Sequence, residues 1–178
     1  MRLTYTDLAD RAAAIRMLLL DVDGTLTSGS LAYTGLEQIT VTFDIKDGLG
    51  IKLAQQAGID VRILSGRASH ALERRAAELG IDRLVTRRSD KSNAFREILE
   101  EGDLEAREIA YVGDDLPDLP VMLRCGLAFA PRDAVEEVRQ AAHRVLSKEG
   151  GRGCVREAIE IILRARGDWE RLVASYRV

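Results

Sequence analysis

The sequence lacks the marks of a membrane-spanning, a disulfide-stabilised or a nucleic-acid-binding protein. No apolar run approaches the roughly 20 residues that cross a bilayer. Only two cysteines occur, Cys125 and Cys154, and they make neither a disulfide framework nor a C-x-x-C site. Lys and Arg total 26 against 29 Asp and Glu, a formal net charge of −3, whereas nucleic acids usually require a basic surface. We therefore expect neither a membrane nor a nucleic acid as a partner.

We also expect no signal peptide at the start of this sequence. The residues before Asp21 include Asp7, Asp10, Arg11 and Arg16, which do not fit an apolar leader. Together with the scarcity of cysteine, this favours the reducing cytoplasm. The 178 residues, 46% of them hydrophobic and 31% charged, fit one globular domain, and no repeat or linker divides them. We expect a single domain over residues 1–178.

Short apolar strands alternate with helical segments along most of the chain. This alternation predicts an α/β fold of Rossmann type, a parallel sheet with helices on both faces. The expected strands are Met17–Val22, Ile59–Leu64, Leu84–Val85, Ile109–Val112, Leu127–Phe129 and Arg144–Leu146. The expected helices are Thr6–Ile15, Gly48–Gln56, Ala68–Leu79, Lys91–Glu101, Leu119–Arg124, Ala134–Ala142, Val155–Ala165 and Trp169–Ser175, the last two forming a helical tail over residues 153–178.

One segment, residues 30–43, breaks the alternation. Its second arm, Ile39–Phe43, alternates apolar residues with Thr, which is the period of a half-buried strand. With Leu31–Tyr33 as the first arm, the segment reads as a projecting β-hairpin. An isolated hairpin is marginal in water, and Ile39, Val41 and Phe43 would stay exposed unless something covered them.

Two acids follow the first apolar strand directly, in the motif Asp21-Val22-Asp23-Gly24-Thr25. In an open α/β sheet, ligands bind beyond the carboxyl ends of the strands, so the sheet delivers both carboxylates to that place. A solvated turn is the plainer interpretation, since Asp is common at strand ends. Three further polar segments in similar positions favour a site instead.

These further segments are Ser65-Gly66-Arg67 after the second strand, Lys91 at a helix start, and Gly113-Asp114-Asp115 with Asp118 after a later strand. In this order, the four motifs resemble those of the haloacid dehalogenase superfamily of phosphohydrolases. The gaps between the motifs hold only the hairpin, single helices and short strands. The chain therefore resembles the members of this superfamily that have no cap domain.

The resemblance implies chemistry by a covalent aspartyl phosphate. In it Asp21 is the nucleophile, Asp23 is first the general acid and then the general base, and Ser65 and Lys91 hold the phosphoryl group. Oxygen ligands suit Mg²⁺, so the expected metal ligands are the Asp21 side chain, the Asp23 carbonyl and the Asp114 side chain. Asp118 is expected to orient a metal-bound water from behind these ligands, and Asp115 either to share that role or to contact the substrate. An equally good interpretation of that last pair is helix N-capping before Leu119.

Three glycine-containing segments narrow the resemblance further. They are Asp44–Gly50, Gly66–Ser69 and Gly150–Glu157, and together with the last acidic motif they are similar to the 3-deoxy-D-manno-octulosonate 8-phosphate phosphatases, a family of tetramers without caps. Cys154 stands where that family usually has Ala. The expected substrate-binding residues are Lys46, Asp47, Gly48, Gly66, Arg67, Arg75 and Arg152. An alternative interpretation is that Arg75 is a solvated residue on the surface of its helix. The glycines would then be ordinary loop residues.

The resemblance implies an Mg²⁺-dependent phosphatase acting on a small 2-keto-3-deoxy sugar acid phosphate in the synthesis of a lipopolysaccharide precursor. The eight-carbon octulosonate 8-phosphate is the expected substrate, and a nine-carbon ulosonic acid 9-phosphate is the alternative. A non-catalytic assembly module, like that of acylneuraminate cytidylyltransferases, is a further alternative. A signalling receiver domain is disfavoured, because such domains pair two adjacent acids with a separate phosphorylated Asp and do not have the Asp-x-Asp-Gly-Thr pattern found in this sequence. A homotetramer built through the hairpins is expected, with the tail closing a site in the same or an adjacent subunit.

Overall fold

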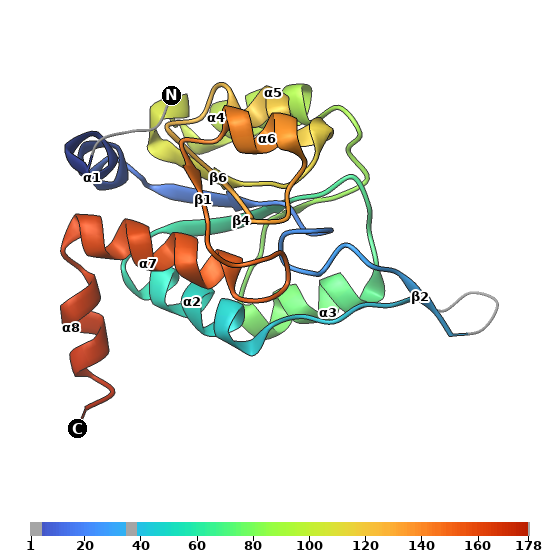
Figure 1. Cartoon of the computed structure of the whole chain (residues 1–178), viewed down its shortest axis with the longest axis horizontal. Coiled ribbons are helices and arrows are strands. Elements are labelled where there is room, and N and C mark those ends of the chain that lie inside the picture. Colours follow the sequence, from blue (N-terminus) through green and yellow to red (C-terminus); the bar gives the residue numbers. More distant parts are fainter. Residues whose placement is uncertain (1–4, 35–38, 178) are drawn as a thin grey trace.

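A computed structural model describes residues 5–34 and 39–177 of the chain. Its centre is one sheet of six parallel strands in the order β5-β4-β1-β6-β7-β8 (Figure 1). The strands are β1 (Met17–Leu20), β4 (Asp60–Leu64), β5 (Leu84–Val85), β6 (Ile109–Val112), β7 (Leu127–Ala130) and β8 (Arg144–Val145). The chain winds outward from β1 in one direction and then returns to continue from β6. The direction of winding therefore reverses between β1 and β6, where open α/β sheets bind their ligands.

The central strand β1 is apolar on both sides because both faces of the sheet are covered. Leu18 and Leu20 point into one core, and Met17 and Leu19 point into the other. All four side chains are fully buried. A run of consecutive apolar residues is what a parallel strand covered on both faces requires.

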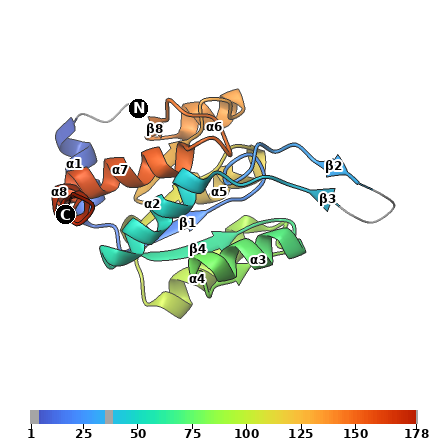
Figure 2. The same ribbon diagram turned by 90° about the horizontal axis from the view of Figure 1, so that it is seen from below.

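Helices cover both faces of the sheet, as Figures 1 and 2 show. One face packs against residues of α1 (Tyr5–Ala13), α2 (Ile45–Gln56), α3 (His70–Leu79), α7 (Cys154–Arg166) and α8 (Trp169–Ala174). The other packs against α4 (Lys91–Gly102), α5 (Leu119–Met122) and α6 (Glu136–Ala141), and the 3₁₀ turns η1 (Ala106–Glu108) and η2 (Leu116–Asp118) complete the chain. The predicted Rossmann-type α/β fold is confirmed. None of the helices in the described part is long and apolar enough to cross a membrane.

The hairpin consists of β2 (Ala32–Tyr33) and β3 (Ile39–Thr40), paired in antiparallel fashion and projecting from the body. Its predicted second arm, Ile39–Phe43, is too long, because the ladder ends at Thr40. In the described part of the hairpin only Ala32 pairs with Thr40 and Tyr33 with Ile39, and Phe43 packs against the hydrophobic core instead of continuing the ladder. The middle of the hairpin, residues 35–38, lies outside the described residues. Between β1 and β4 the described chain holds only this hairpin and α2, so that interval contains no cap domain.

The helix expected over Gly48–Gln56 begins earlier, at Ile45. Asp44 caps it, its Oδ1 accepting the amide of Lys46 at 2.6 Å. Lys46, Asp47 and Gly48 therefore lie in the first turn of a helix rather than in a loop. The glycines serve close packing, since a Cβ on Gly48 would lie 2.2 Å from a nitrogen of Arg75. The other predicted elements differ from the observed ones by two residues or fewer at most ends.

Candidate active site

Polar side chains gather in a cleft of about 450 Å³ beyond the carboxyl ends of β1, β4 and β6. These are the central strand and its two neighbours, so residues far apart in the sequence meet there. Residues of all four sequence motifs line the cleft: Asp21, Asp23, Ser65, Gly66, Arg67, Lys91, Asp114, Asp115 and Asp118. Gly29, Arg88, Ser89 and Pro117 complete the lining.

Lys91 joins the acidic groups at the bottom of the cleft. Its Nζ lies 2.6 Å from Asp21 Oδ1 and 2.6 Å from Asp118 Oδ1, and all three side chains are nine-tenths or more buried. Burial alone would lower the pKa of Lys91, but Asp21 and Asp118 outweigh it and raise the pKa above its usual value. The lysine therefore stays charged and fixes the Asp21 carboxylate in one orientation.

Every hydrogen-bonding position of Asp118 is occupied. Oδ1 accepts from Lys91 and from the hydroxyl of Tyr111, each at 2.6 Å. Oδ2 accepts the backbone amides of Asp114 at 2.8 Å and Asp115 at 3.2 Å. A carboxylate with four donors has no lone pair left for another ligand. Asp118 thus orients its neighbours, whereas Asp115 caps the short turn that follows by accepting the amide of Leu116.

Asp114 is different because one of its carboxylate oxygens, Oδ1, is buried and has no hydrogen-bond partner in the described structure. Carboxylate oxygens of Asp21, Asp114 and Asp118 lie within 4.8 Å of one another. Burial, and then the nearby charge of Asp21, raises the pKa of Asp114 to about 8. The pKa of Asp21 is raised to about 6, first by burial and second by the negative charge of Asp118, although Lys91 acts to lower it. Crowded carboxylates with one orphaned oxygen fit a hard divalent cation such as Mg²⁺.

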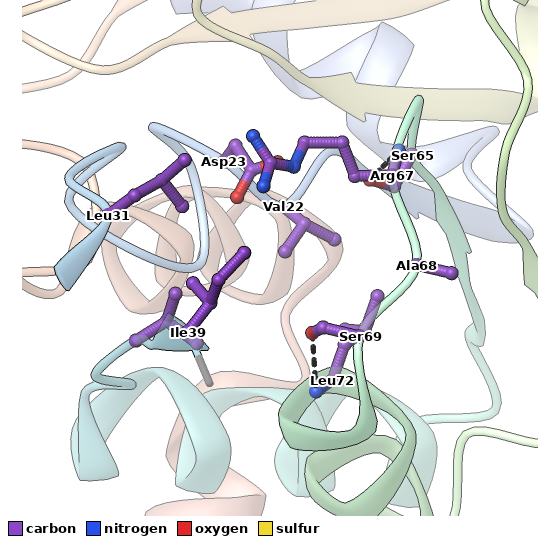
Figure 3. Close-up of a pocket in the computed structure, with 10 residues that line it drawn as sticks. Val22, Asp23, Leu31, Ile39, Ser65, Arg67, Ala68, Ser69 and Leu72 are labelled. Carbon is purple, nitrogen blue, oxygen red and sulfur yellow. Dashed lines mark hydrogen bonds and ion pairs between the residues drawn. The ribbon is translucent and has the colours of Figure 1, made fainter. Parts of the chain in front are cut away.

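Ser65, Gly66 and Arg67 form the second side of the cleft, after β4. Ser65 is almost fully buried, and its Oγ accepts the amide of Arg67 at 3.2 Å. Arg67 lies half-exposed with its Nε 3.6 Å from Asp23 Oδ2. Figure 3 shows this arginine reaching across toward Asp23, above a small pocket that Leu31 and Ile39 of the hairpin share with Leu72 of α3. The hairpin therefore borders the entrance of the site.

Five predicted substrate-binding residues do not line this cleft. Lys46 is exposed on the first turn of α2, beside the buried Gly48. Arg75 contacts the Asp44 carbonyl at 3.4 Å and Glu78 at 3.3 Å, and Arg152 is exposed near Glu149. For these four residues, contact with the substrate stays a prediction.

Asp47 is the fifth, and its position differs most from the expectation. Its side chain is 1% exposed and faces the start of α7 instead of the cleft. Both carboxylate oxygens accept backbone amides there. Burial raises its pKa to about 6, against the lowering effect of the amides of Arg156 and Gly153.

Sequence reasoning missed five residues of the site, one of which is Pro117 in the acidic loop. Arg88 and Ser89 immediately precede the Asp90-Lys91 start of α4, so proximity to Lys91 was an available signal. Tyr111 sits inside the apolar strand β6, where an aromatic residue reads as core. Gly29 follows the Asp-x-Asp-Gly-Thr motif by only four residues and reaches the cleft through the turn before the hairpin, so proximity to that motif was again an available signal.

Comparisons with known proteins agree with this geometry. A profile of haloacid dehalogenase-like hydrolases matches residues 81–158. The 3-deoxy-D-manno-octulosonate 8-phosphate phosphatase of Haemophilus influenzae is 41% identical over 153 residues, which cover 86% of this chain and 85% of that protein. A probable YrbI family phosphatase from Pseudomonas syringae has a crystal structure with a TM-score of 0.95 at 41% identity, covering 97% of this chain and 98% of the other.

A third relative carries ligands. The 3-deoxy-D-manno-octulosonate 8-phosphate phosphatase of Moraxella catarrhalis, crystallised with a magnesium ion, a phosphate ion and a KDO molecule, has a TM-score of 0.94 at 33% identity and covers 96% and 98% of the two chains. The fold and the acidic site define a haloacid dehalogenase-like hydrolase. Within that superfamily, the chain belongs to the 3-deoxy-D-manno-octulosonate 8-phosphate phosphatase family.

Proposed function

We propose that this protein is a phosphoric monoester hydrolase that converts 3-deoxy-D-manno-octulosonate 8-phosphate to 3-deoxy-D-manno-octulosonate and phosphate. The observation that carries the proposal is the buried contact of Lys91 with Asp21 and Asp118, at the edge of the sheet where the direction of winding reverses between β1 and β6. A fixed carboxylate beside a permanent cation suits attack on an anionic phosphorus centre. The relatives with this name support the choice of substrate.

The cofactor of the proposed reaction is Mg²⁺. The Asp21 and Asp114 side chains and the Asp23 carbonyl would hold it, and the orphaned Asp114 Oδ1 supports this assignment. Asp118 would not bind the metal ion directly, because its oxygens already accept hydrogen bonds. It would instead orient the residues that surround the metal ion. When bound, a divalent cation neutralises phosphoryl charge that would otherwise repel the attacking carboxylate.

Asp21 and Asp23 divide the work of the proposed reaction. A bond forms between an Asp21 oxygen and phosphorus while the ester bond from phosphorus to the sugar oxygen breaks, and Asp23 gives that oxygen its proton. Asp23 then takes a proton from water, whose oxygen attacks phosphorus and releases Asp21 and inorganic phosphate. Asp23 is suitably accessible for this exchange, with about a third of its side chain exposed.

Ser65, Gly66 and Arg67 would hold the phosphate and the nearest part of the sugar, since they line the cleft opposite the acids. Arg67 supplies a half-exposed guanidinium for an anionic group of the substrate. Lys46, Gly48, Arg75 and Arg152 remain candidates for the more distant sugar and carboxylate contacts.

The proposed protein acts as a homotetramer in the cytoplasm, making a lipopolysaccharide precursor. Support for assembly comes from Tyr33 and Ile39 of the hairpin and Ile45 of α2, which are exposed in a single chain. The reducing cytoplasm suits the two free cysteines, both buried. The helix α8 and the end of the chain lie at the opposite end of the molecule from the hairpin (Figures 1 and 2). The start of the tail, at Cys154, lies beside the loop that follows Asp23 in the same chain, whereas a contribution of α8 to catalysis would be made at a neighbour's site.

The test compares specificity constants for eight-carbon and nine-carbon ulosonic acid phosphates, with an aryl phosphate as the general substrate. We expect the octulosonate 8-phosphate to be preferred, chelation to stop turnover, and Mg²⁺ to restore it. Asp21→Asn should abolish turnover, whereas Asp82→Asn, at an exposed position outside the cleft, should not. A preference for the nine-carbon substrate would move the assignment to the alternative substrate. No turnover of any phosphate would favour the non-catalytic assembly module.

A further inference from the structure

The helix α7 begins without a side-chain cap from its own segment. Its N-cap residue is Gly153, which has φ +94° and no side chain to accept the first amides. Helix starts leave several backbone N–H groups unpaired, and a buried start needs acceptors from elsewhere. In this protein the acceptor comes from another helix, α2.

Asp47 supplies that acceptor. Its Oδ1 accepts the amide of Arg156 at 2.7 Å, and its Oδ2 accepts the amide of Gly153 at 3.2 Å. The Arg156 side chain turns away to Glu160 at 2.6 Å and to the ring of Trp169. The charge of Asp47 is therefore balanced mainly by the positive end of the α7 dipole. Asp47 thus joins α2 to α7, which lie side by side in both views (Figures 1 and 2).

The segment that leads into α7 lies against the loop that carries Asp23. Gly151 donates its amide to the Thr25 carbonyl at 2.8 Å, and Cys154 Sγ lies 3.2 Å from the same oxygen. A Cβ on Gly150 would lie 1.8 Å from the Gly24 carbonyl oxygen. Backbone packs on backbone here, so a shift at the start of α7 has to move the loop over residues 24–27.

We propose that Asp47 is a positioning residue for phosphoester hydrolysis, which holds the first turn of α7 and through Gly150 and Gly151 fixes the catalytic loop after Asp23. The inference rests on the proposed phosphatase function for its effect on turnover. Its structural part, the restraint of residues 22–28, does not depend on the substrate. The carboxylate contacts no reacting group, so it acts only through α7 and the loop.

The experiment compares Asp47→Asn with Ile162→Val at pH 8, where Asp47 is ionised. Asn keeps the shape but turns an NH₂ toward an amide, so one contact is lost. Ile162 lies fully buried further along α7, and its substitution loosens packing away from the catalytic loop. Circular dichroism fixes a temperature at which all proteins are folded.

At that temperature we expect kcat of Asp47→Asn to fall about tenfold or more with KM changed less than twofold, and Ile162→Val to keep its kcat. Amide hydrogen exchange over residues 22–28 should accelerate in Asp47→Asn alone. If Asp47→Asn does not fold, Asp47→Glu, which keeps the charge and displaces the carboxylate, should show the same two effects. Unchanged exchange in that loop, or equal loss of kcat in Ile162→Val, would overturn the proposal. If the sugar substrate is misassigned, kcat can be measured with an aryl phosphate. If no phosphate is turned over, amide hydrogen exchange over residues 22–28 alone tests the restraint by Asp47.

Discussion

At the scale of single residues, Gly24 controls how closely Asp114 can approach the catalytic loop. A Cβ at this position would lie 2.0 Å from Asp114 Oδ2, and the φ of Gly24 is +83°. A side chain there meets both a backbone penalty and a direct clash with a carboxylate. The glycine of the Asp-x-Asp-Gly-Thr motif therefore permits the turn and also leaves room for the Asp114 carboxylate.

We expect Gly24→Ala to abolish most activity and to raise the Mg²⁺ concentration needed for half-maximal turnover. The matched control is Gly58→Ala, because Gly58 has a similar φ of +79° but no atom within 4 Å of the added Cβ. Both variants should lose about 1 kcal/mol or more of unfolding free energy from backbone strain, and only Gly24→Ala should lose turnover. Equal activities in steady-state assays would show that Asp114 yields to the new methyl group.

Tyr111 lies behind Asp118 and Lys91, where its hydroxyl donates to Asp118 and accepts from Lys91 Nζ at 3.4 Å. Tyr111→Phe removes one buried hydrogen bond to a charged acceptor, worth about 1.5–3 kcal/mol, without changing the ring. We expect kcat to fall several-fold with little change in KM, because Asp118 then holds Lys91 less firmly. Tyr176→Phe, at an exposed position, is the control. A change confined to melting temperature would limit Tyr111 to stability.

At the scale of secondary structure elements, His143 fastens the end of α6 to β7. Its backbone amide donates to the Ala128 carbonyl at 2.9 Å, and its Nδ1 accepts the Ala128 amide at 2.9 Å. This second bond requires Nδ1 to be unprotonated. Burial, and then the positive charge of Arg11, lowers the pKa of His143 in the folded protein.

The sign of the resulting pH dependence follows from that lowered pKa. The unfolded chain binds the proton more readily, so the contribution of His143 is complete above the unfolded pKa of about 6.5 and is lost as the pH falls below it. Asp47, with a pKa raised by burial, acts in the opposite direction, so the wild type must be compared with a variant. Denaturant unfolding at pH 7.5 and pH 5.5 should give a smaller stability difference between wild type and His143→Asn at the lower pH. A constant difference would exclude this coupling, and His70→Asn, at a fully exposed site, controls for histidine loss.

At the scale of the whole molecule, the hairpin and the start of α2 leave large apolar side chains in solvent. Tyr33 is 69% exposed and Ile45 is 82% exposed, beside a hairpin whose described pairing is only two residues long on each strand. Burial of these side chains between subunits would stabilise both the hairpin and the assembly.

Light scattering at micromolar concentration should therefore report a tetramer for the wild type. Tyr33→Asp should shift the population toward smaller species, because a charge in an apolar contact is costly. Leu123→Asp replaces an equally exposed side chain that follows α5, and it should leave the assembly intact. A monomeric wild type would refute the assembly proposal, and dissociation by Leu123→Asp would place the contact elsewhere.

Local sequence was enough to predict the sheet, the order of its strands along the chain and the acids that follow them. Each of these depends on residues next to one another, such as the apolar run that ends at Asp21. The family resemblance supplied the catalytic roles, which stay predictions, as does the single-domain boundary at residues 1–178. The predicted start of α2, at Gly48, is three residues late because Ile45, Lys46 and Asp47 read as part of a glycine-containing segment that leads into a helix, although Asp44 offered a capping signal.

The tertiary structure alone decided what the remaining polar residues do. Asp47 and Arg156 are 109 residues apart in sequence, and Lys91 and Asp21 are 70 apart, so no local pattern relates them. Tyr111 reads as core until the turn after β6 brings Asp118 back beneath it. A side chain's partner depends on which elements pack together, and that packing is set by burial summed over the whole chain. Local sequence therefore predicted the kind of chemistry, and packing decided which side chains meet in the cleft and which groups hold them in place.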